Sequence, residues 1–397
     1  MKTVGIICEY NPLHLGHVSH IEKTRAVMGV GAAVVCVMSG NYVQRGDFAV
    51  FNKHARAEAA VRCGADLVVE IPSPYALLSA EGFAAAGVSI LDRLGVCDYI
   101  SFGSESGDIG LLQEAAGVLV SPEVSALVKE GLRRGLPYAS AQQRAADVLL
   151  GPHSDVLRSP NNLLGIEYLK AIAASNSPLL PITVKRTGGD HDGSSGFAAS
   201  VMREELITGE KPWYNMTPQA ASEVFLREIA AGRGPVSAKS CELAMLSRLR
   251  EIDDFSGLSG VSEGLDSRFS KYAASEPSIS GILDHVKTKR YAMSRIRRVL
   301  MCACLGFSAA DVQTPPPYAR VLAMNRTGMR LLKAARDKAE LPIITKPASV
   351  SKYPGPVADV FAKEAAATDF YVLGYQDEAS RSGGQEWRQT PVVIDRE

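Results

Sequence analysis

The first 105 residues alternate short apolar segments with helical patterns, and this alternation most constrains the fold. Apolar runs rich in Val and Ile cover residues 4–8, 32–38, 67–71 and 98–102. These runs do not alternate with polar residues, so each strand is predicted to be buried on both faces. Buried strands separated by helices indicate an α/β fold with a doubly wound parallel sheet. Such sheets bind ligands beyond the C-terminal ends of their strands.

The second half of the chain has a different pattern. Helical segments with one strand at residues 181–184 continue to residue 207. Beyond residue 212 the pattern is mainly helical, with a strand-helix-strand stretch at 318–345. We therefore expect an N-terminal ligand-binding α/β domain over residues 1–212 and a mostly helical α+β region over residues 213–397.

Composition excludes several classes of protein. The chain has 397 residues and equal numbers of basic and acidic residues, 43 each, so any nucleic-acid contact must come from a local basic patch. No segment approaches the ~20 apolar residues that cross a bilayer. The seven cysteines lack the spacing of a zinc site or a disulfide framework. We expect a cytoplasmic protein with reduced thiols and no membrane contact, and no feature indicates a protein partner.

The tetrapeptide His14-Leu15-Gly16-His17 is the clearest candidate site. It follows the first strand where a helix begins, and the free N–H groups of a helix start favour an anion. Two imidazoles three residues apart share a helix face and can donate to phosphate oxygens as charge builds at the α-phosphorus. The alternatives are a capping and a surface histidine, or a zinc site with His20. The zinc site is disfavoured because the spacing differs from H-E-x-x-H.

A second candidate group is cationic. Lys185-Arg186 ends the strand at 181–184, and Ser200 and Arg203 lie at an expected helix start. Arginine suits the β- and γ-phosphates of a departing pyrophosphate because it binds them through two donors. A capping serine and a solvated arginine are the alternative.

Three polar segments have open roles. Asn161-Asn162 precedes a helix, where one amide is expected to cap the helix and the other to contact a ribose or base. Gly103 ends the fourth strand and either lies under an adenine or makes the turn. His191 lies on a Gly-rich loop as a candidate proton acceptor or a solvated residue.

Two further segments are candidates for RNA contact. The loop at 39–47 carries Tyr42 and Arg45, and Tyr42 is predicted to receive an unstacked base. Basic residues at spacings of three and four predict one basic helical face, for which a solvated face is the alternative. This face comprises Lys287, Arg290, Ser294, Arg297 and Arg298, with Lys289 and Arg295 beside it.

These motifs together resemble the bacterial tRNA(Met) cytidine acetate ligases, which are related to the HxGH nucleotidyltransferases. The resemblance is carried by residues 5–17, 38–46, 102–105, 159–168, 184–186, 287–291, 317–322 and 341–346, and so spans nearly the whole chain. One departure is that many relatives have Ser-Ala-Thr-x-Ile-Arg where this chain has Ala198-Ala199-Ser200-Val201-Met202-Arg203. The change removes one hydroxyl and keeps Arg203.

The resemblance implies a two-step reaction. Acetate attacks the α-phosphate of ATP to give acetyl-adenylate, and the N4 amine of the wobble cytidine in elongator tRNA(Met) then takes the acetyl group. Mg²⁺ is expected with ATP, and its ligands cannot be named. The implied catalytic residues are His14, His17, Lys185 and Arg203. The implied ATP-contacting residues are Ile7, Cys8, Glu9, Tyr10, Asn11, Pro12, Leu13, His14, Leu15, Gly16, His17, Val18, Ser19, His20, Gly103, Asn161, Asn162, Lys185, Arg186 and Ser200. The expected RNA-contacting residues are Tyr42, Arg45, Lys287, Lys289, Arg290, Arg295, Arg297 and Arg298.

Two rival functions stay open from the residues alone. A small-molecule nucleotidyltransferase of the HxGH class would share the His14–His17 site without needing an RNA-binding half. An RNA-binding protein that kept the fold without catalysis would not need His14, His17 and Arg203 together.

Overall fold

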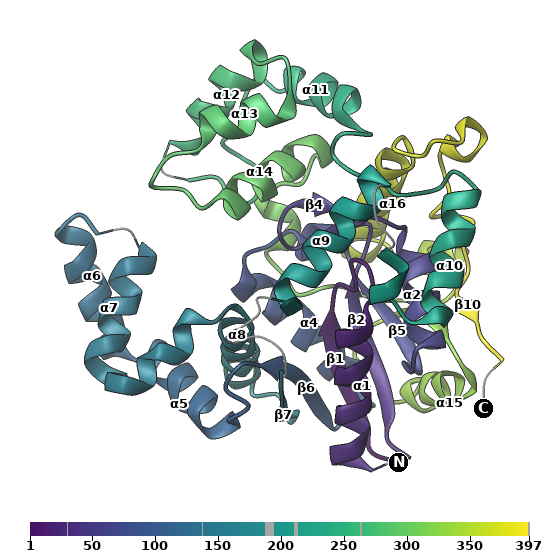
Figure 1. Ribbon diagram of the computed structural model, residues 1–397, viewed down its shortest axis with the longest axis horizontal. Coiled ribbons are helices and arrows are strands. Elements are labelled where there is room, and N and C mark those ends of the chain that lie inside the picture. The colour runs from purple at the N-terminus through teal and green to yellow at the C-terminus, as the bar shows by residue number, and fades with distance from the viewer. Residues whose placement is uncertain (30, 137, 187–193, 210–212, 263, 396–397) are drawn as a thin grey trace.

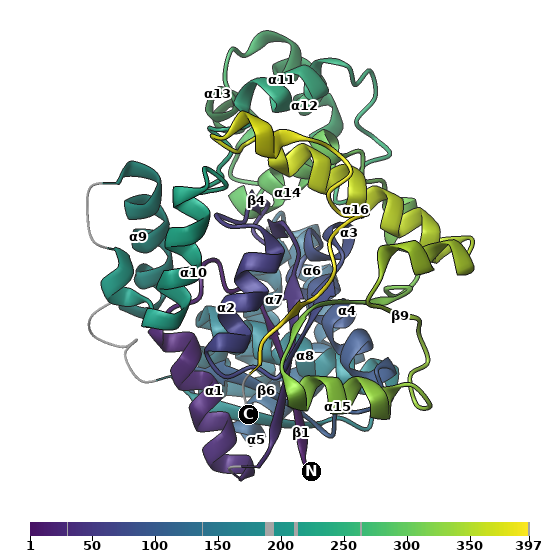
Figure 2. The same cartoon turned by 90° about the vertical axis from the view of Figure 1, so that its right-hand side faces the viewer.

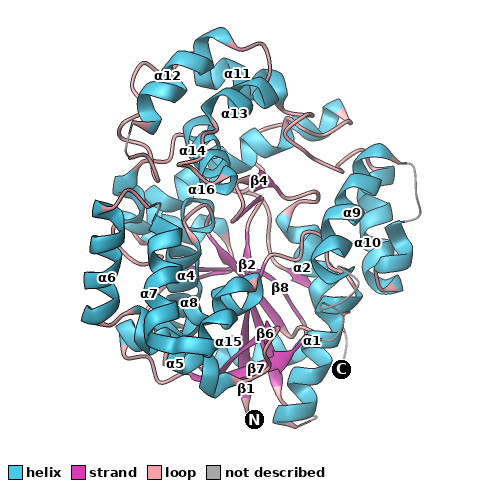
Figure 3. Cartoon of the chain, turned by 60° about the vertical axis from the view of Figure 1, so that its left-hand side comes forward, coloured by secondary structure: helices cyan, strands magenta, loops and turns pink. Residues whose placement is uncertain are grey.

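The computed structural model describes residues 1–397 apart from 30, 137, 187–193, 210–212, 263 and 396–397. The described residues form one sheet of eight strands in the order β10-β8-β5-β2-β1-β6-β7, with β9 beside β8, and a separate β3-β4 hairpin. Helices cover both faces of the sheet (Figures 1 and 3). The strands are β1 (Thr3–Cys8), β2 (Ala33–Ser39), β3 (Tyr42–Val43), β4 (Asp47–Phe48), β5 (Leu67–Ile71), β6 (Tyr99–Ser104), β7 (Leu180–Lys185), β8 (Ala319–Met324), β9 (Ile343–Ile344) and β10 (Val392–Val393).

Strands β5, β2, β1, β6 and β7 are parallel, which confirms the predicted fold class. Successive side chains of β2 enter two different cores. Val35 and Val37 face a core shared with helix α4, whereas Val34 and Cys36 face a core shared with helices α1 and α2. All four are buried completely. The uninterrupted apolar runs in the sequence therefore reflect strands that are covered on both faces.

The helices fall into three groups. On the two faces of the sheet lie α1 (Leu15–Met28), α2 (Lys53–Arg62), α3 (Ser73–Ala76), α4 (Ala80–Arg93), α5 (Ile109–Leu119), α8 (Pro160–Ser175), α9 (Ser194–Thr208), α10 (Gln219–Ala230) and α15 (Arg326–Ala335). A lobe at the top of Figure 1 contains α11 (Glu242–Arg250), α12 (Leu265–Ser275), α13 (Ile279–Val286) and α14 (Met293–Leu305), and α16 (Pro356–Val372) packs against it (Figure 2). A projecting hairpin contains α6 (Pro122–Arg133) and α7 (Tyr138–Leu150).

The region after residue 212 adds strands to the sheet that the N-terminal residues begin. Strand β8 lies antiparallel beside β5, and β9 and β10 extend the sheet from β8. The sequence placed a strand at 318–324, but nothing local in that strand indicated β5 as its partner. The first core likewise combines Val69 of β5 with Val321 of β8.

A buried ionic network joins the two parts of the chain. The Lys53 ammonium group lies 2.7 Å from Glu70 Oε1, 3.0 Å from Glu364 Oε1 and 2.7 Å from Glu386 Oε2. Arg320 Nε lies 3.2 Å from Glu386 Oε1. None of these five side chains is more than 1% exposed. Three carboxyl groups face two cations. Burial, and to a smaller extent the negative charge of Glu364, raise the pKa of Glu70 well above its usual range. The network is therefore neutral when Glu70 holds a proton.

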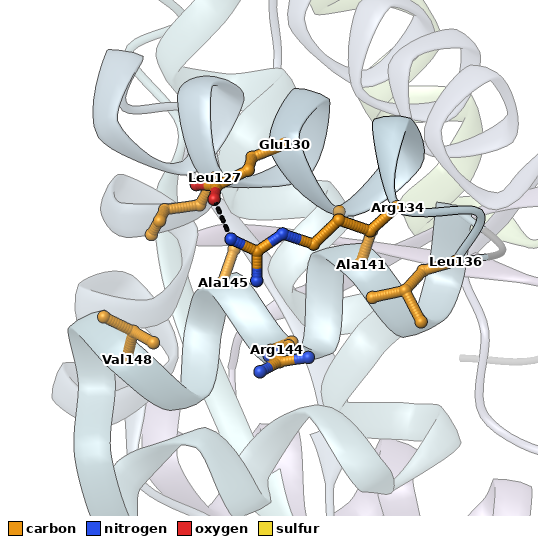
Figure 4. Close-up of a pocket in the computed structure, with 9 residues that line it drawn as sticks. Leu127, Glu130, Arg134, Leu136, Ala141, Arg144, Ala145 and Val148 are labelled. Atoms are coloured by element: carbon orange, nitrogen blue, oxygen red, sulfur yellow. Dashed lines mark hydrogen bonds and ion pairs between the residues drawn. The ribbon is translucent and has the colours of Figure 1, made fainter.

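The α6–α7 hairpin has a small core of its own around Val124 and Val128. A cavity of about 110 Å³ lies between the two helices, where Arg134 pairs with Glu130 (Figure 4). The cavity is lined only by residues of this hairpin, so it has no part in the predicted site. Among the described residues no single helix is long and apolar enough to span a membrane; α5 and α6 reach that length only as a pair bent by 62°.

Candidate active site

His14 and His17 form a reciprocal cap at the start of α1. His14 Nδ1 accepts a hydrogen bond from Gly16 N–H at 3.1 Å, and His17 Nδ1 accepts from His14 N–H at 3.2 Å. The two rings stack with centroids 3.7 Å apart. A Cβ at position 16 would lie 2.9 Å from His14 Cε1, so glycine is needed there for the histidine as well as for the helix start.

The burial and hydrogen bonds of this cap determine the protonation state and the tautomer of both imidazoles. Burial, followed by the charges of Arg186 and Arg203, lowers the pKa of His14 to about 4. Burial and the neighbouring His14 lower the pKa of His17 well below its usual range. Both rings are therefore neutral near pH 7. Because each Nδ1 accepts a hydrogen bond, each Nε2 carries the proton and is the donor that a phosphate oxygen can use.

Two of the predicted cations, Arg186 and Arg203, lie close to this pair. Arg203 on α9 donates from Nη1 to Asn11 O at 2.9 Å, directly before the histidines. Arg186 follows β7 and is close enough to lower the pKa of His14, His17 and His20. Lys185, at the end of β7, packs its stem against Gly107, where a Cβ would approach to 2.6 Å. A polyanion bound at the start of α1 thus meets positive charge on two sides.

The role predicted for Asn161 and Asn162 is wrong in one respect. Neither amide caps α8; instead the Glu105 carboxylate accepts from Asn161 N–H at 3.2 Å and from Asn162 N–H at 2.8 Å. Asn162 Oδ1 accepts in return from Glu105 N–H and Ser106 N–H at 2.9 and 3.1 Å. Asn162 is 3% exposed, and its hydrogen bonds to Glu105 and Ser106 hold the loop that follows β6, whereas Gly103 lies within β6 itself. Sequence reasoning assigned no such role to Glu105.

The residues of the segment 7–20 differ in their burial and in their contacts. Leu13 has no exposed surface and Tyr10 is 2% exposed. Leu15 and Gly16 are exposed at the start of α1. His20 Nε2 bonds to Ser101 Oγ at 3.0 Å. The described residues hold no group of three or more His, Cys, Asp or Glu side chains that could bind a metal ion.

The α9 residues lie differently from the prediction. Ser200 and Arg203 are in the middle of α9, because the helix begins at Ser194 and not near residue 200. Ser200 is exposed. His191 lies outside the residues that the structure describes.

Tyr42 cannot receive a base, which corrects its predicted role. Its ring is completely buried, its hydroxyl donates to Ala367 O at 2.8 Å, and it packs against Phe48 and Tyr371. Arg45 on the same loop is exposed. The loop is polar in sequence, but α16, more than 300 residues further on, covers it.

A buried arginine that sequence reasoning missed ties this loop to the site. Arg56 on α2 has no exposed surface and donates to the carbonyl oxygens of Glu9, Ser39, Gly40 and Phe51. It therefore binds the ends of β1 and β2 together. Its position within an Ala-rich helical pattern gave no sign of this, because arginine is rarely buried.

The predicted basic helical face is interrupted. Helix α13 ends at Val286 and α14 begins at Met293, so Lys287, Lys289 and Arg290 lie on the intervening turn. Lys287 Nζ donates to Tyr291 O, and Tyr291 is buried, which anchors this turn to the lobe. The basic side chains still gather in one region, because the turn leads directly into α14 with Arg295, Arg297 and Arg298.

The neutral histidines make stability depend on pH. An unfolded histidine has a pKa near 6.5, so below that pH the unfolded chain binds more protons than the folded chain. We expect the free energy of unfolding to fall as the pH drops from 6.5 towards 4, by up to ~3 kcal/mol for a histidine with the pKa of His14. Urea unfolding from pH 7 to 5 measures this fall. His20→Gln, which keeps a partner for Ser101, should flatten it, whereas exchange of the exposed His153 should not.

The fold and the site define the class of protein. A profile of the HIGH nucleotidyl transferase family matches residues 1–386, so the chain belongs to that family. The tRNA(Met) cytidine acetate ligase of Acetivibrio thermocellus is 36% identical over 99% of this chain and 100% of its own. That of Caldanaerobacter subterraneus subsp. tengcongensis is 37% identical over 95% and 96%.

A solved structure agrees over the full length. Thermotoga maritima TmcAL, bound with alpha-thio ATP, superposes with a TM-score of 0.91 and 32% identity, covering 100% of both chains. Within the HIGH nucleotidyl transferases, the chain is thus a member of the tRNA(Met) cytidine acetate ligase family, which confirms the resemblance seen in the sequence.

Proposed function

We propose that this chain is a tRNA(Met) cytidine acetate ligase that activates acetate as acetyl-adenylate and transfers the acetyl group to N4 of the wobble cytidine of elongator tRNA(Met). The observation that carries the proposal is the stacked, neutral His14–His17 pair at the start of α1, with Arg186 and Arg203 beside it. The likeness to tRNA(Met) cytidine acetate ligases covers the whole chain and supports tRNA(Met) as the acceptor of the acetyl group.

The geometry suits attack of acetate on the α-phosphate of ATP. Charge develops on the α-phosphate oxygens in the transition state, and the two Nε2–H groups and the start of α1 are donors that already point out of the cap. Lys185, Arg186 and Arg203 supply the charge that the departing pyrophosphate needs. Mg²⁺ is expected on the ATP phosphates themselves. A cytoplasmic location suits ATP, acetate and tRNA together.

The transfer step needs a path from this site to the RNA. Gly46, with φ of +76°, lies against the main chain of Arg297 and Arg298, so the loop that carries Arg45 joins the site to α14. Arg45 and Arg297 are exposed on these adjoining segments, and Lys289 is exposed on the turn before α14. Acetyl-adenylate needs such proximity, because it must reach the amine before water does.

We expect Lys289→Gln together with Arg297→Gln to weaken tRNA binding and to reduce its salt dependence. Each lost phosphate contact should lower the slope of log K against log salt by about one. Filter binding of tRNA(Met) between 50 and 300 mM salt measures both quantities. The matched control is Arg330→Gln with Lys333→Gln, which removes two exposed cations from α15 at the opposite end of the molecule (Figure 2). An equal loss in both double variants would contradict the assigned surface.

The decisive test of the function is product formation. The purified chain is incubated with ATP, Mg²⁺, acetate and either tRNA(Met) or a tRNA without the target cytidine, and the digested nucleosides are analysed by mass spectrometry. N4-acetylcytidine that depends on ATP, acetate and tRNA(Met) is the expected result. Acetyl-adenylate or another adenylylated small molecule without modified RNA would favour the small-molecule nucleotidyltransferase.

A further inference from the structure

One carboxylate stands within the cationic site. Glu9 directly follows β1, and its Oε1 accepts from Gln44 N–H at 2.6 Å, while its main-chain oxygen accepts from Arg56. The residue as a whole is half-buried. Within the described residues Oε2 has no hydrogen-bond partner. Two residues further on, Arg203 binds Asn11 O.

The chemistry of the first step does not explain this carboxylate. ATP and acetate are anions, and a carboxylate beside them raises their energy. The second substrate is different, because the reacting end of cytosine is an amine with two N–H donors. Carboxylates accept from N4 of cytosine in protein–nucleic acid complexes. Glu9 therefore matches the N4 amine of cytosine, and it does not match uracil, which has an acceptor at the same position.

We propose that Glu9 accepts a hydrogen bond from N4 of the target cytidine and takes its proton during acetyl transfer. The inference rests on the proposed function and names a catalytic residue for its second step. As N4 attacks the acetyl carbonyl carbon, the N4–C bond forms, the bond from that carbon to the phosphate oxygen breaks, and AMP leaves. The proton from N4 moves to Oε2 of Glu9, because Oε1 is held by Gln44. The products are N4-acetylcytidine and AMP.

The surroundings of Glu9 suit proton transfer. Burial raises the pKa of its carboxyl above the usual range, although the Gln44 N–H and the charges of Arg45, Arg56 and Arg203 oppose the rise. The hydroxyl of Tyr168 on α8 faces the same region, and burial, Cys8 and Glu9 raise its pKa well above the usual range, so it stays protonated. A base whose pKa lies closer to neutrality is a more effective proton acceptor.

Synthetic acetyl-adenylate isolates the transfer step from the first step. The full chain is mixed with acetyl-adenylate and tRNA(Met) in a single turnover between pH 5 and 9, and N4-acetylcytidine is followed by mass spectrometry. The wild-type rate should fall at acidic pH as Glu9 becomes protonated. Glu9→Gln keeps an oxygen for Gln44 N–H but cannot take a proton. Its transfer rate should therefore be at least ~10²-fold lower than that of the wild type and should no longer fall at acidic pH. Glu22→Gln on α1 is the matched exposed control, with wild-type behaviour.

The outcomes separate this inference from the proposed function. If Glu9→Gln transfers acetyl at the wild-type rate and with the same fall at acidic pH, the proposed role of Glu9 is overturned. If in that case acetyl-adenylate formation alone is impaired, the carboxylate acts in the ATP-dependent step. A wild-type chain that does not transfer acetyl at all would overturn the proposed function, and the role of Glu9 with it. If Glu9→Gln does not fold, Glu9→Asp replaces it: the shorter carboxylate should transfer slowly but retain the acidic fall, and loss of that fall would contradict the proposal.

Discussion

Replacing Lys53 with methionine should destabilise the protein by ~3–5 kcal/mol, because it leaves buried carboxylates without their cation. Burial would lower the pKa of Lys53, but the carboxylates of Glu364, Glu386 and Glu70 raise it above its ordinary value, so the ammonium group stays charged. Burial opposes ionisation of Glu386, yet Lys53 and Arg320 lower its pKa to about 2. Chemical denaturation at pH 7 measures the loss.

The control and a second variant distinguish this network from an ordinary ion pair. Lys239, which is 82% exposed and lies 2.5 Å from Glu242, should tolerate methionine with a change below ~0.5 kcal/mol. Adding Glu364→Gln to Lys53→Met removes one of the carboxyl groups that lose their cation and should recover part of the loss. A Lys53→Met protein as stable as the wild type would show that the network does not hold the two halves of the chain together.

Replacing His17 with asparagine should reduce acetyl-adenylate formation by ~10²–10³-fold, the usual cost of losing one preorganised donor in a transition state. Asparagine Oδ1 can take the place of Nδ1 as the acceptor for His14 N–H, so the cap is kept while the Nε2–H donor is lost. The loss should appear mainly in kcat, because the donor acts on charge that develops during the reaction.

Acetate-dependent exchange of labelled pyrophosphate into ATP measures this step without tRNA. His153→Asn is the matched control, because His153 is exposed on the short helix η1 (Gly151–Arg158), and this variant should retain full activity. If His17→Asn were to exchange pyrophosphate at the wild-type rate, Nε2–H of His17 would have no part in the transition state.

The His14–His17 site could be predicted from the sequence more fully than the way in which distant segments pack around it. The strands β1, β2, β5 and β6 were predictable because both their faces are buried, which leaves uninterrupted apolar runs. The His14–His17 pair was predictable because it lies where the first of these strands leads into a helix. The pairing of β8 with β5 was not, because an apolar run does not identify its neighbour in the sheet.

The errors arise where distant segments cover polar-looking ones. Tyr42 lies in a loop of polar residues, yet Ala367 and Tyr371 of α16 enclose it. Lys53 and Arg320 are charged residues that a local pattern assigns to the surface, and only their carboxylate partners on other elements allow their burial. The spacing of basic residues predicted one helix across residues 287–298, but α13 ends at Val286 and α14 begins at Met293, with Tyr291 buried on the turn between them.

Acetate labelled with ¹⁸O in both carboxyl oxygens tests most directly whether acetate itself attacks the α-phosphate of ATP. The purified chain is supplied with labelled acetate, ATP, Mg²⁺ and tRNA(Met), and the AMP released is analysed by mass spectrometry. Attack by acetate places one of its oxygens on phosphorus, and that oxygen stays with AMP when the amine takes the acetyl group. We predict one ¹⁸O atom in each AMP released by acetyl transfer. Unlabelled AMP alongside N4-acetylcytidine would contradict an acetyl-adenylate intermediate at the His14–His17 site.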